Sequence, residues 1–225
     1  MANSFNVLII DDHPLIIKAY QAALKHISKT RSDYSFDVDT ADDCDGANDK
    51  IQRANRGTGL DLVFLDISLP PSENGEILSG EDLGLILRDI LPKTKIIVST
   101  TYTQNVRLNS LLQSVKPDGF LIKTDVTPEI LVEAIETVII EPPFYSKTVL
   151  NYFRKRSAHD FALDKTDRRL LFELTRGAKM NELPEILNLS LAAIERRKRI
   201  LKEEFDVEGR SDRDLILAAE MAGFI

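Results

Sequence analysis

Three aspartates and one lysine stand directly after apolar runs of the chain. Asp11 and Asp12 follow NVLII, and Asp66 follows LDLVFL. Lys123 follows GFLI in the same way. Carboxylates that lie close together repel one another and need a cation between them. Because an all-oxygen cluster suits a hard ion such as Mg²⁺, these aspartates predict a metal site wherever the fold brings them together.

The elements that must position these side chains are short apolar strands. Helix-length segments such as 14–27 and 128–139 separate them, and continuous apolar strands alternating with helices indicate a parallel sheet covered on both faces. We therefore expect a doubly wound α/β domain with a five-stranded parallel sheet. The expected strands are 6–10, 60–65, 95–99 and 119–122, with 36–41 as a weaker edge strand.

In a sheet of this type the functional site lies beyond the carboxyl ends of the strands. The aspartates and Lys123 occupy that position, and so does Ser99-Thr100-Thr101 after the fourth strand. Aspartate is also common after strands as a loop cap, so one such residue alone would decide nothing. The repetition at successive strand ends favours a metal-binding site over a set of caps.

Composition and charge narrow the class of protein. The chain has 225 residues, 43% of them hydrophobic, and its one cysteine, Cys44, is expected as a surface thiol in a reducing compartment. The sequence starts without a signal-peptide pattern and has no apolar run long enough to span a bilayer, so we expect a cytoplasmic protein without a membrane partner. Residues 1–141 hold 13 Lys and Arg against 22 Asp and Glu, whereas 142–225 hold 16 against 14, so the two parts are expected to have different partners.

The motifs around the strand ends resemble a known family. IIDDHPLI, LDISLP, VSTTY and FLIKTD are similar to the receiver domain of two-component response regulators, and DDHP is typical of the NarL/FixJ class. The resemblance covers residues 1–141. It implies that a sensor histidine kinase phosphorylates the chain, that the chain catalyses this transfer itself, and that slow hydrolysis follows. Asp66 would be the phosphoacceptor, Asp11, Asp12, Asp66 and the Ser68 carbonyl would hold Mg²⁺, and Thr100 and Lys123 would bind the phosphoryl oxygens.

The resemblance also implies a switch. Phe120 stands three residues before Lys123, where the family has an aromatic residue that turns inward as Thr100 moves toward the phosphoryl group. The alternative is that Phe120 belongs to the core and has no other role. His13 is expected to pack against the following helix or to cap it.

The segment after Asp66 departs from the family pattern. Gly80 comes fourteen residues after Asp66 where the family has about eight, so about six polar residues are inserted beside the predicted site. Such a loop could control the access of the kinase to the site, or it could set the lifetime of the phosphoryl group. A tolerated surface insertion is the simpler interpretation.

Residues 142–163 begin with Pro-Pro and are predicted as a linker with a short helix. Residues 164–225 predict a small all-α helix-turn-helix domain. Thr166 or Asp167 would cap its first helix, Pro184 would lie in the first turn of the second and Ser190 would cap the third. A fourth helix from Ser211 could support a homodimer when the protein is active.

The third of these helices carries the residues predicted to contact promoter DNA. A small residue and charged side chains on one exposed face suit entry into the major groove. Residues 163–225 resemble the LuxR/NarL-type DNA-binding domain, although Glu195 stands where that family often has lysine, so that Glu195 could accept a hydrogen bond from a cytosine amino group. The predicted contacts are Ala192, Glu195, Arg196, Arg199 and Lys202.

The sequence thus predicts a two-domain response regulator in which phosphorylation of Asp66 controls DNA binding and transcription. One alternative is a phosphorylation-controlled regulator that acts by protein contact, because Glu195 and the acidic first domain also suit that role. A phosphate-metabolising hydrolase is a third class, but the sequence offers no second aspartate as acid or base for it.

Overall fold

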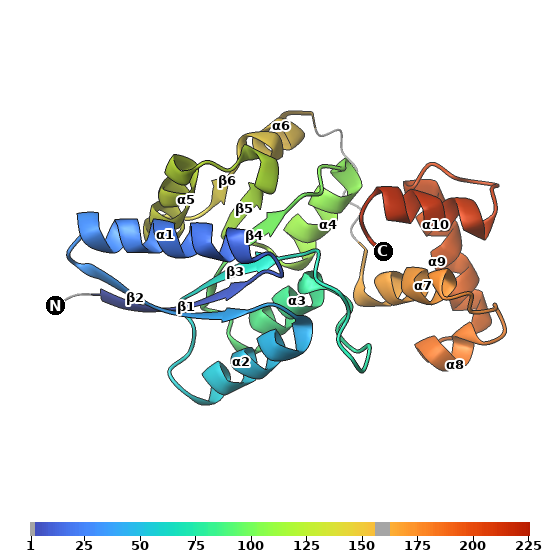
Figure 1. Cartoon of the computed structure of the whole chain (residues 1–225). Coiled ribbons are helices and arrows are strands. Elements are labelled where there is room, and N and C mark those ends of the chain that lie inside the picture. The colour runs from blue at the N-terminus through green and yellow to red at the C-terminus, as the bar shows by residue number, and fades with distance from the viewer. Residues whose placement is uncertain (1–2, 156–162) are drawn as a thin grey trace. The chain divides into compact units, whose positions relative to one another are not determined.

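The computed structural model of the chain describes residues 3–155 and 163–225 (Figure 1). It divides into two compact units. The first is made of Met1–Thr101 and Val115–Arg156 and contains the sheet. The second is made of Tyr102–Ser114 and Ser157–Ile225 and is helical in its described part.

Within the described residues the sheet has six strands in the order β2-β1-β3-β4-β5-β6, and every neighbouring pair is parallel. The parallel sheet predicted from the apolar runs is confirmed, with FDVDTA in the edge strand β2. The expected number of five strands was wrong by one, because part of the predicted linker pairs with β5. The strands are β1 Asn3–Ile10, β2 Tyr34–Ala41, β3 Leu62–Asp66, β4 Lys95–Thr100, β5 Gly119–Ile122 and β6 Phe144–Tyr145.

Helices cover both faces of this sheet, as a doubly wound fold requires. α1 and α5 lie on one face, and α2 and α3 lie on the other (Figure 1). A short 3₁₀ helix, η1, follows β5 and contains the predicted phosphoryl-binding lysine. The helices up to residue 155 are α1 Pro14–Thr30, α2 Cys44–Arg56, α3 Gly80–Ile90, α4 Asn105–Ser114, η1 Lys123–Asp125, α5 Pro128–Ile140 and α6 Lys147–Lys155.

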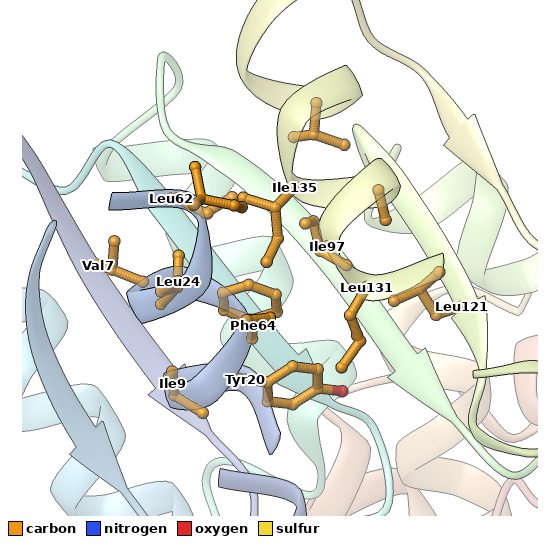
Figure 2. Packing of buried hydrophobic residues seen from close by; sticks show 14 of the residues in the cluster. Val7, Ile9, Tyr20, Leu24, Leu62, Phe64, Ile97, Leu121, Leu131 and Ile135 are labelled. Carbon is orange, nitrogen blue, oxygen red and sulfur yellow. The ribbon is translucent and has the colours of Figure 1, made fainter. Parts of the chain in front are cut away.

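The main hydrophobic core lies between the sheet and the pair α1 and α5 (Figure 2). Tyr20 of α1 stacks on Phe64 of β3 with ring centroids 4.4 Å apart. Leu131 and Ile135 of α5 close the same layer, one helical turn from each other. Because β3 is buried over its whole length, its position in the middle of the sheet is fixed by packing on both faces.

The prediction that Cys44 is a surface thiol was wrong. Cys44 begins α2 and is only 1% exposed, on the same helix face as Ala47 and Ile51. Burial raises the pKa of the thiol to about 12, so the group stays protonated and unreactive. The spacing of these three residues is that of one buried helix face, a pattern which a single cysteine does not reveal.

The second unit contains the predicted helix-turn-helix region. Ser190 caps α9 and Pro184 lies in the first turn of α8, as expected, and Ser211, where a fourth helix was expected to start, caps α10. The predicted cap of α7 was wrong, because Asp164 is the N-cap and Asp167 is the third residue of a reciprocal capping box. The helices are α7 Lys165–Thr175, α8 Leu183–Leu187, α9 Leu191–Glu204 and α10 Asp212–Met221.

These helices enclose a small core of their own. Ile194 and Leu201 of α9 are fully buried against Leu170 of α7 and Leu215 of α10. Residues 156–162 of the predicted linker lie outside the described residues. None of the described helices combines the length and the apolar composition that a membrane span requires.

Candidate functional site

The site is built where the order of the strands changes direction. β1 and β3 are neighbours in the sheet although β2 lies between them in the sequence, and Ile10 of β1 is opposite Leu65 of β3. Asp11 and Asp66 follow these two residues and therefore lie next to each other at the carboxyl edge. This change of strand order is where ligands bind in open α/β sheets, so the prediction from strand ends has a topological cause.

Lys123 joins the two buried aspartates. Its Nζ lies 2.8 Å from Oδ2 of Asp11 and 2.8 Å from Oδ2 of Asp66. Both carboxylates are almost fully buried, and the lysine side chain is only 11% exposed. One ammonium group thus balances two carboxylates at the end of β5, and these three predicted site residues are brought into direct contact.

The environment changes the acidity of both partners. Burial raises the pKa of Asp66 above its ordinary value, more than the hydrogen bonds from Lys123 and from the backbone N–H of Ser68 lower it. Burial lowers the pKa of Lys123, but its bonds to Asp11 and Asp66 outweigh this and raise it overall. The lysine therefore stays protonated at neutral pH and remains a fixed positive charge beside Asp66.

The backbone holds Asp66 in place from two sides. The N–H of Ser68 donates to Oδ1 of Asp66 at 3.0 Å, which leaves Oδ2 for the lysine. Gly80, the first residue of α3, packs so closely that a Cβ there would lie 1.8 Å from the carbonyl oxygen of Asp66. The sequence analysis notes Gly80 only as the glycine that follows Asp66 after the insertion. The steric reason for a glycine at this position appears only in the fold.

Four side chains could hold a cation at this edge. Ligand atoms of Asp11, Asp12, His13 and Asp66 all lie within 4.8 Å of one another. Three of the four are carboxylates, and this donor set fits a hard divalent ion, so the acidic pocket can hold a metal. His13 was not predicted as part of the group.

His13 occupies the N-cap position of α1, as its place before Pro14 suggests, but its side chain makes no capping hydrogen bond. Its backbone N–H donates to Oδ1 of Asp11 at 3.0 Å, and its Nδ1 contacts Oδ1 of Asp12. His13 therefore occupies the predicted capping position, but its side chain does not cap the helix. Its imidazole instead touches the exposed member of the aspartate pair.

The predicted switch residues are both fully buried. Thr100 ends β4 opposite Ile122, and Phe120 lies opposite Val98 within β5. Thr100 thus stands at the same sheet edge as Lys123, on the neighbouring strand. Whether these two residues move together stays a prediction.

The polar insertion before Gly80 forms a closed turn. Ser72 accepts a hydrogen bond from the N–H of Ile77 at 3.0 Å, and its own N–H donates to the carbonyl of Ile77 at 2.8 Å. The N–H of Glu73 donates to Asp45 at the start of α2, at 3.0 Å. The loop is thus tied to itself and to α2, and Ile77 is buried beneath it.

Helix α9 exposes most of the residues that were predicted to contact DNA. Ala192, Glu195, Arg196 and Arg199 are exposed, which agrees with a shared outer face. Lys202 is engaged within the unit, because its Nζ lies 2.9 Å from Asp212 and donates to the carbonyl of Arg210 at 2.8 Å.

Two further basic residues of α9 also pair inside the unit. Arg197 lies 2.7 Å from both Asp164 and Asp167 of the α7 capping box, and Lys198 pairs with Asp212. α9 has five basic residues, and because Arg197, Lys198 and Lys202 are paired within the unit, this number overstates the positive charge that the helix offers to a partner. Arg196 and Arg199 are the exposed arginines on the predicted contact face.

Comparison with known proteins decides the family. The signature described as the response regulator receiver domain matches residues 7–136, which includes the aspartate cluster and Lys123. The chain belongs to the response regulator family. Receiver domains of this family are phosphoryl acceptors. The chain is 29% identical over 215 residues to the nitrate/nitrite response regulator protein NarP of Escherichia coli K12, covering 93% of this chain and 92% of NarP.

Other similarities also extend over the whole receiver and the helical region after it. The chain is 24% identical over 213 residues to the response regulator UvrY of Escherichia coli K12, covering 91% of this chain and 89% of UvrY. Among solved structures it resembles RcsB from Salmonella enterica serovar Typhimurium bound to promoter rprA in the presence of the phosphomimetic BeF3⁻. That likeness has a TM-score of 0.67 at 21% identity and covers 97% of this chain and 99% of RcsB, so it supports the fold of both parts.

Proposed function

We propose that this response regulator is of the NarL/FixJ class and that phosphorylation of Asp66 controls its binding to promoter DNA and thereby transcription. Residues 1–141 are the receiver, 142–163 the linker and 164–225 the DNA-binding domain in this proposal. The observation that carries it is the bridging of Asp11 and Asp66 by the Lys123 ammonium at the topological switch point. That arrangement provides a nucleophile beside a fixed cation.

The transfer reaction follows from this arrangement. The Asp66 carboxylate attacks the phosphorus of a phosphohistidine on a sensor kinase, an O–P bond forms, and the P–N bond breaks. The departing imidazole nitrogen takes a proton from solvent. Lys123 pairs with a phosphoryl oxygen, and the Thr100 hydroxyl at the end of β4 donates to another.

The acidic pocket supports this chemistry. Asp11, Asp12, Asp66 and the backbone carbonyl of Ser68 would hold Mg²⁺, which when bound supplies positive charge to the phosphoryl group. The product is an aspartyl phosphate on the protein itself. The chain is thus a self-modifying acceptor in the cytoplasm, with slow hydrolysis of its own phosphoryl group, and has no separate substrate that it turns over.

The phosphoryl group would act through Thr100 and Phe120. Thr100 moves toward the new oxygens, and the Phe120 ring on the next strand repacks inward. The support for this coupling is that both side chains are fully buried on adjacent strands, two positions apart in register, where close packing leaves little room for one to shift alone.

The output part of the proposal rests on the exposed face of α9. Ala192 allows close approach, Arg196 and Arg199 can contact guanines or phosphates, and Glu195 can accept from a cytosine amino group. Lys202 would add a phosphate contact only by leaving Asp212. RcsB, which shares this fold, is described as bound to promoter DNA and as forming dimers on DNA, and a homodimer of this chain is proposed on the same basis.

A regulator that acts by protein contact is the second candidate. The specific observation in its favour is that Arg197, Lys198 and Lys202 are paired with aspartates of the same unit. The exposed face of α9 then carries Glu195 together with Arg196 and Arg199, so its charge is mixed. Such a face could bind a protein partner without touching DNA.

The test has two steps on the full chain. Incubation with acetyl phosphate and Mg²⁺ should add one phosphoryl group by intact mass to the wild type and to the Asp89→Asn control, and none to Asp66→Asn. An equal adduct on Asp66→Asn would overturn the phosphoacceptor assignment.

Binding to genomic DNA fragments is then measured with and without the phosphodonor at several salt concentrations. DNA contact through phosphates gives an affinity that falls steeply with salt. Phosphorylation should strengthen that binding in the wild type and leave Asp66→Asn unchanged. Binding that is absent at low salt in every state would favour the protein-contact candidate.

A further inference from the structure

The loop that carries Lys123 is tied to the beginning of α6 by a single carboxylate. Asp125, two residues after Lys123 in η1, accepts hydrogen bonds from the Ser146 hydroxyl at 2.7 Å and from the Thr148 hydroxyl at 2.9 Å. It also accepts one from the Thr148 backbone N–H at 2.8 Å. Burial raises the pKa of Asp125, but these bonds outweigh it and lower the pKa, so the group is a carboxylate at neutral pH.

This carboxylate acts as the cap of α6. The first intrahelical bond runs from the N–H of Leu150 to the carbonyl of Ser146, which leaves the N–H of Thr148 without a partner in the helix. A helix of this kind normally uses the side chain of its own N-cap residue. Here Asp125 takes that place from 23 positions away in the sequence.

The N-cap residue Ser146 is used for a different contact. Its hydroxyl accepts a hydrogen bond from the N–H of Ile122 at 3.1 Å, and its own N–H donates to the carbonyl of Phe120 at 2.9 Å. Ser146 is only 3% exposed. The start of α6 is therefore bonded to the strand that carries Phe120 and to both sides of Lys123.

We propose that Asp125 is a positioning residue that holds the start of α6 against the Lys123 loop in the unphosphorylated chain, and that phosphorylation of Asp66 releases it. This inference rests on the proposed function of Asp66. Its basis is that Asp125 contacts no reacting atom and acts through the three-residue helix η1, which Lys123 begins and Asp125 ends.

The direction of the effect follows from the geometry. In the unphosphorylated chain Lys123 bridges Asp11 and Asp66. A phosphoryl group on Asp66 would pair with the Lys123 ammonium in place of these carboxylates and would thereby shift the first residue of η1. The bonds of Asp125 are already at 2.7 to 2.9 Å, and hydrogen bonds weaken steeply once their geometry is lost. A shift of η1 thus weakens the cap of α6, the last helix of the first unit in the sequence.

Thermodynamic linkage makes the same statement in reverse. If the conformation adopted on phosphorylation has a weaker cap, then removal of the cap must favour that conformation over the unphosphorylated one by the same factor. A residue that only stabilises the fold would give the opposite result, since its loss would lower the population of the competent structure. The phosphorylated fraction at limiting phosphodonor therefore separates a coupling role from a merely structural one.

The experiment uses the full chain, acetyl phosphate and Mg²⁺, with intact mass for the phosphoryl group and hydrogen exchange for the first turn of α6. In the wild type, phosphorylation should speed exchange there by roughly fivefold, the factor expected for loss of one N-cap. Asp125→Ala, which removes the acceptor of all three bonds, should show fast exchange in both states and a larger phosphorylated fraction. Thr148→Val removes one bond and should lie between the two, while Thr148→Ser, which keeps the hydroxyl, should restore the wild-type behaviour.

Thr127→Ala is the matched control, because Thr127 caps α5 two residues after Asp125 through the N–H of Ile130 and makes no described bond to residues 146–148. It should leave the exchange of α6 and the phosphorylated fraction unchanged. A phosphorylated wild type with unaltered exchange in α6 would overturn the inference, and so would an equal response in Asp125→Ala. A wild type that takes up no phosphoryl group would instead overturn the proposed function.

Discussion

Gly80 and Asp66 are in backbone contact: a Cβ on Gly80 would lie 1.8 Å from the carbonyl oxygen of Asp66 and 3.0 Å from the Cα of Ile67. The obstacle is backbone, which cannot rotate away as a flexible side chain can. α3 therefore begins against the nucleophile's own peptide group. The approach requires the absence of a side chain at this position, because real Cβ atoms do not come so close to a carbonyl oxygen.

Gly80→Ala should therefore displace α3 or Asp66. We expect a loss of about 1–3 kcal/mol of stability from overpacking, together with slower phosphorylation by acetyl phosphate. Gly75→Ala is the control, since Gly75 has φ of +67° but nothing within 4 Å of a Cβ. That variant should lose about 1 kcal/mol from backbone strain and phosphorylate at the wild-type rate. Equal phosphorylation rates in all three proteins would show that the contact does not position Asp66.

Lys123→Gln should separate metal binding from phosphoryl binding. Loss of the ammonium leaves Asp11 and Asp66 without their shared partner, so Mg²⁺ should bind more tightly, as followed by titration. Phosphorylation should nevertheless slow by roughly 10- to 100-fold, because one charge-assisted hydrogen bond to the phosphoryl group is lost. Lys95→Gln removes an ion pair with Asp118 away from the site and should change neither quantity. Weaker Mg²⁺ binding with normal phosphorylation would contradict the assigned role.

Asp118 should contribute to the free energy of unfolding in a way that depends on pH in the acid range. It pairs with Arg88 at 2.9 Å and Lys95 at 3.1 Å and accepts from the N–H of Ile96 at 3.0 Å. Burial raises its pKa, but these contacts prevail and lower it. Because the folded pKa lies below the unfolded value of about 3.9, the contribution is complete above that pH and is lost as pH falls through the folded pKa.

The corresponding measurement is urea unfolding of the wild type and Asp118→Asn across the acid range. The variant should be less stable by about 1–3 kcal/mol at pH 7, and the difference should shrink below about pH 4. Asp89→Asn, at an exposed position on α3, serves as the control and should follow the wild type. If the stability difference grew as the pH falls, the pKa of Asp118 would be raised in the folded state and not lowered, and the prediction would be wrong.

The two kinds of basic residue on α9 should behave differently toward DNA. Arg199 is exposed, and its Ala variant should lose about 1–3 kcal/mol of binding if it reads a guanine, with relaxed specificity at one position. Lys202→Ala should matter less, because its ammonium is already paired with Asp212. Site selection and affinity at fixed salt measure both. A larger loss for Lys202→Ala than for Arg199→Ala would mean that the ion pair opens on DNA.

The sequence predicts most of the receiver because its signals are local. NVLII, LDLVFL and GFLI are continuous apolar runs, and a buried parallel strand needs no more than that to be recognised. The rule that sites lie at carboxyl ends of strands then placed Asp11, Asp66 and Lys123 together, and the structure brings them within 2.8 Å. Ser190 is predicted as a cap for the same reason, since a cap depends on a few adjacent residues.

Apart from the N-cap of α7, the features that the sequence analysis missed depend on distant parts of the chain. β6 is two residues long and exists because β5 offers it a partner, so it has no periodicity of its own. The burial of Cys44 reflects which face of α2 meets the sheet. The internal pairing of Lys198 and Lys202 requires Asp212, which lies beyond the turn that follows α9. Asp125 looks like an ordinary polar loop residue until Thr148 is placed beside it.

The sixth strand also bears on where the receiver can be cut from the rest of the chain. A fragment that ends at Glu141, the boundary drawn from the sequence, would remove Phe144, Tyr145 and Ser146 and leave the carbonyl of Phe120 and the N–H of Ile122 without their partners. β5 would become an open edge of four buried residues, GFLI, which is the kind of strand that pairs with another molecule and aggregates. Self-association of such a fragment would therefore be an artefact of truncation, and a fragment that retains α6 is the sound choice for solution work.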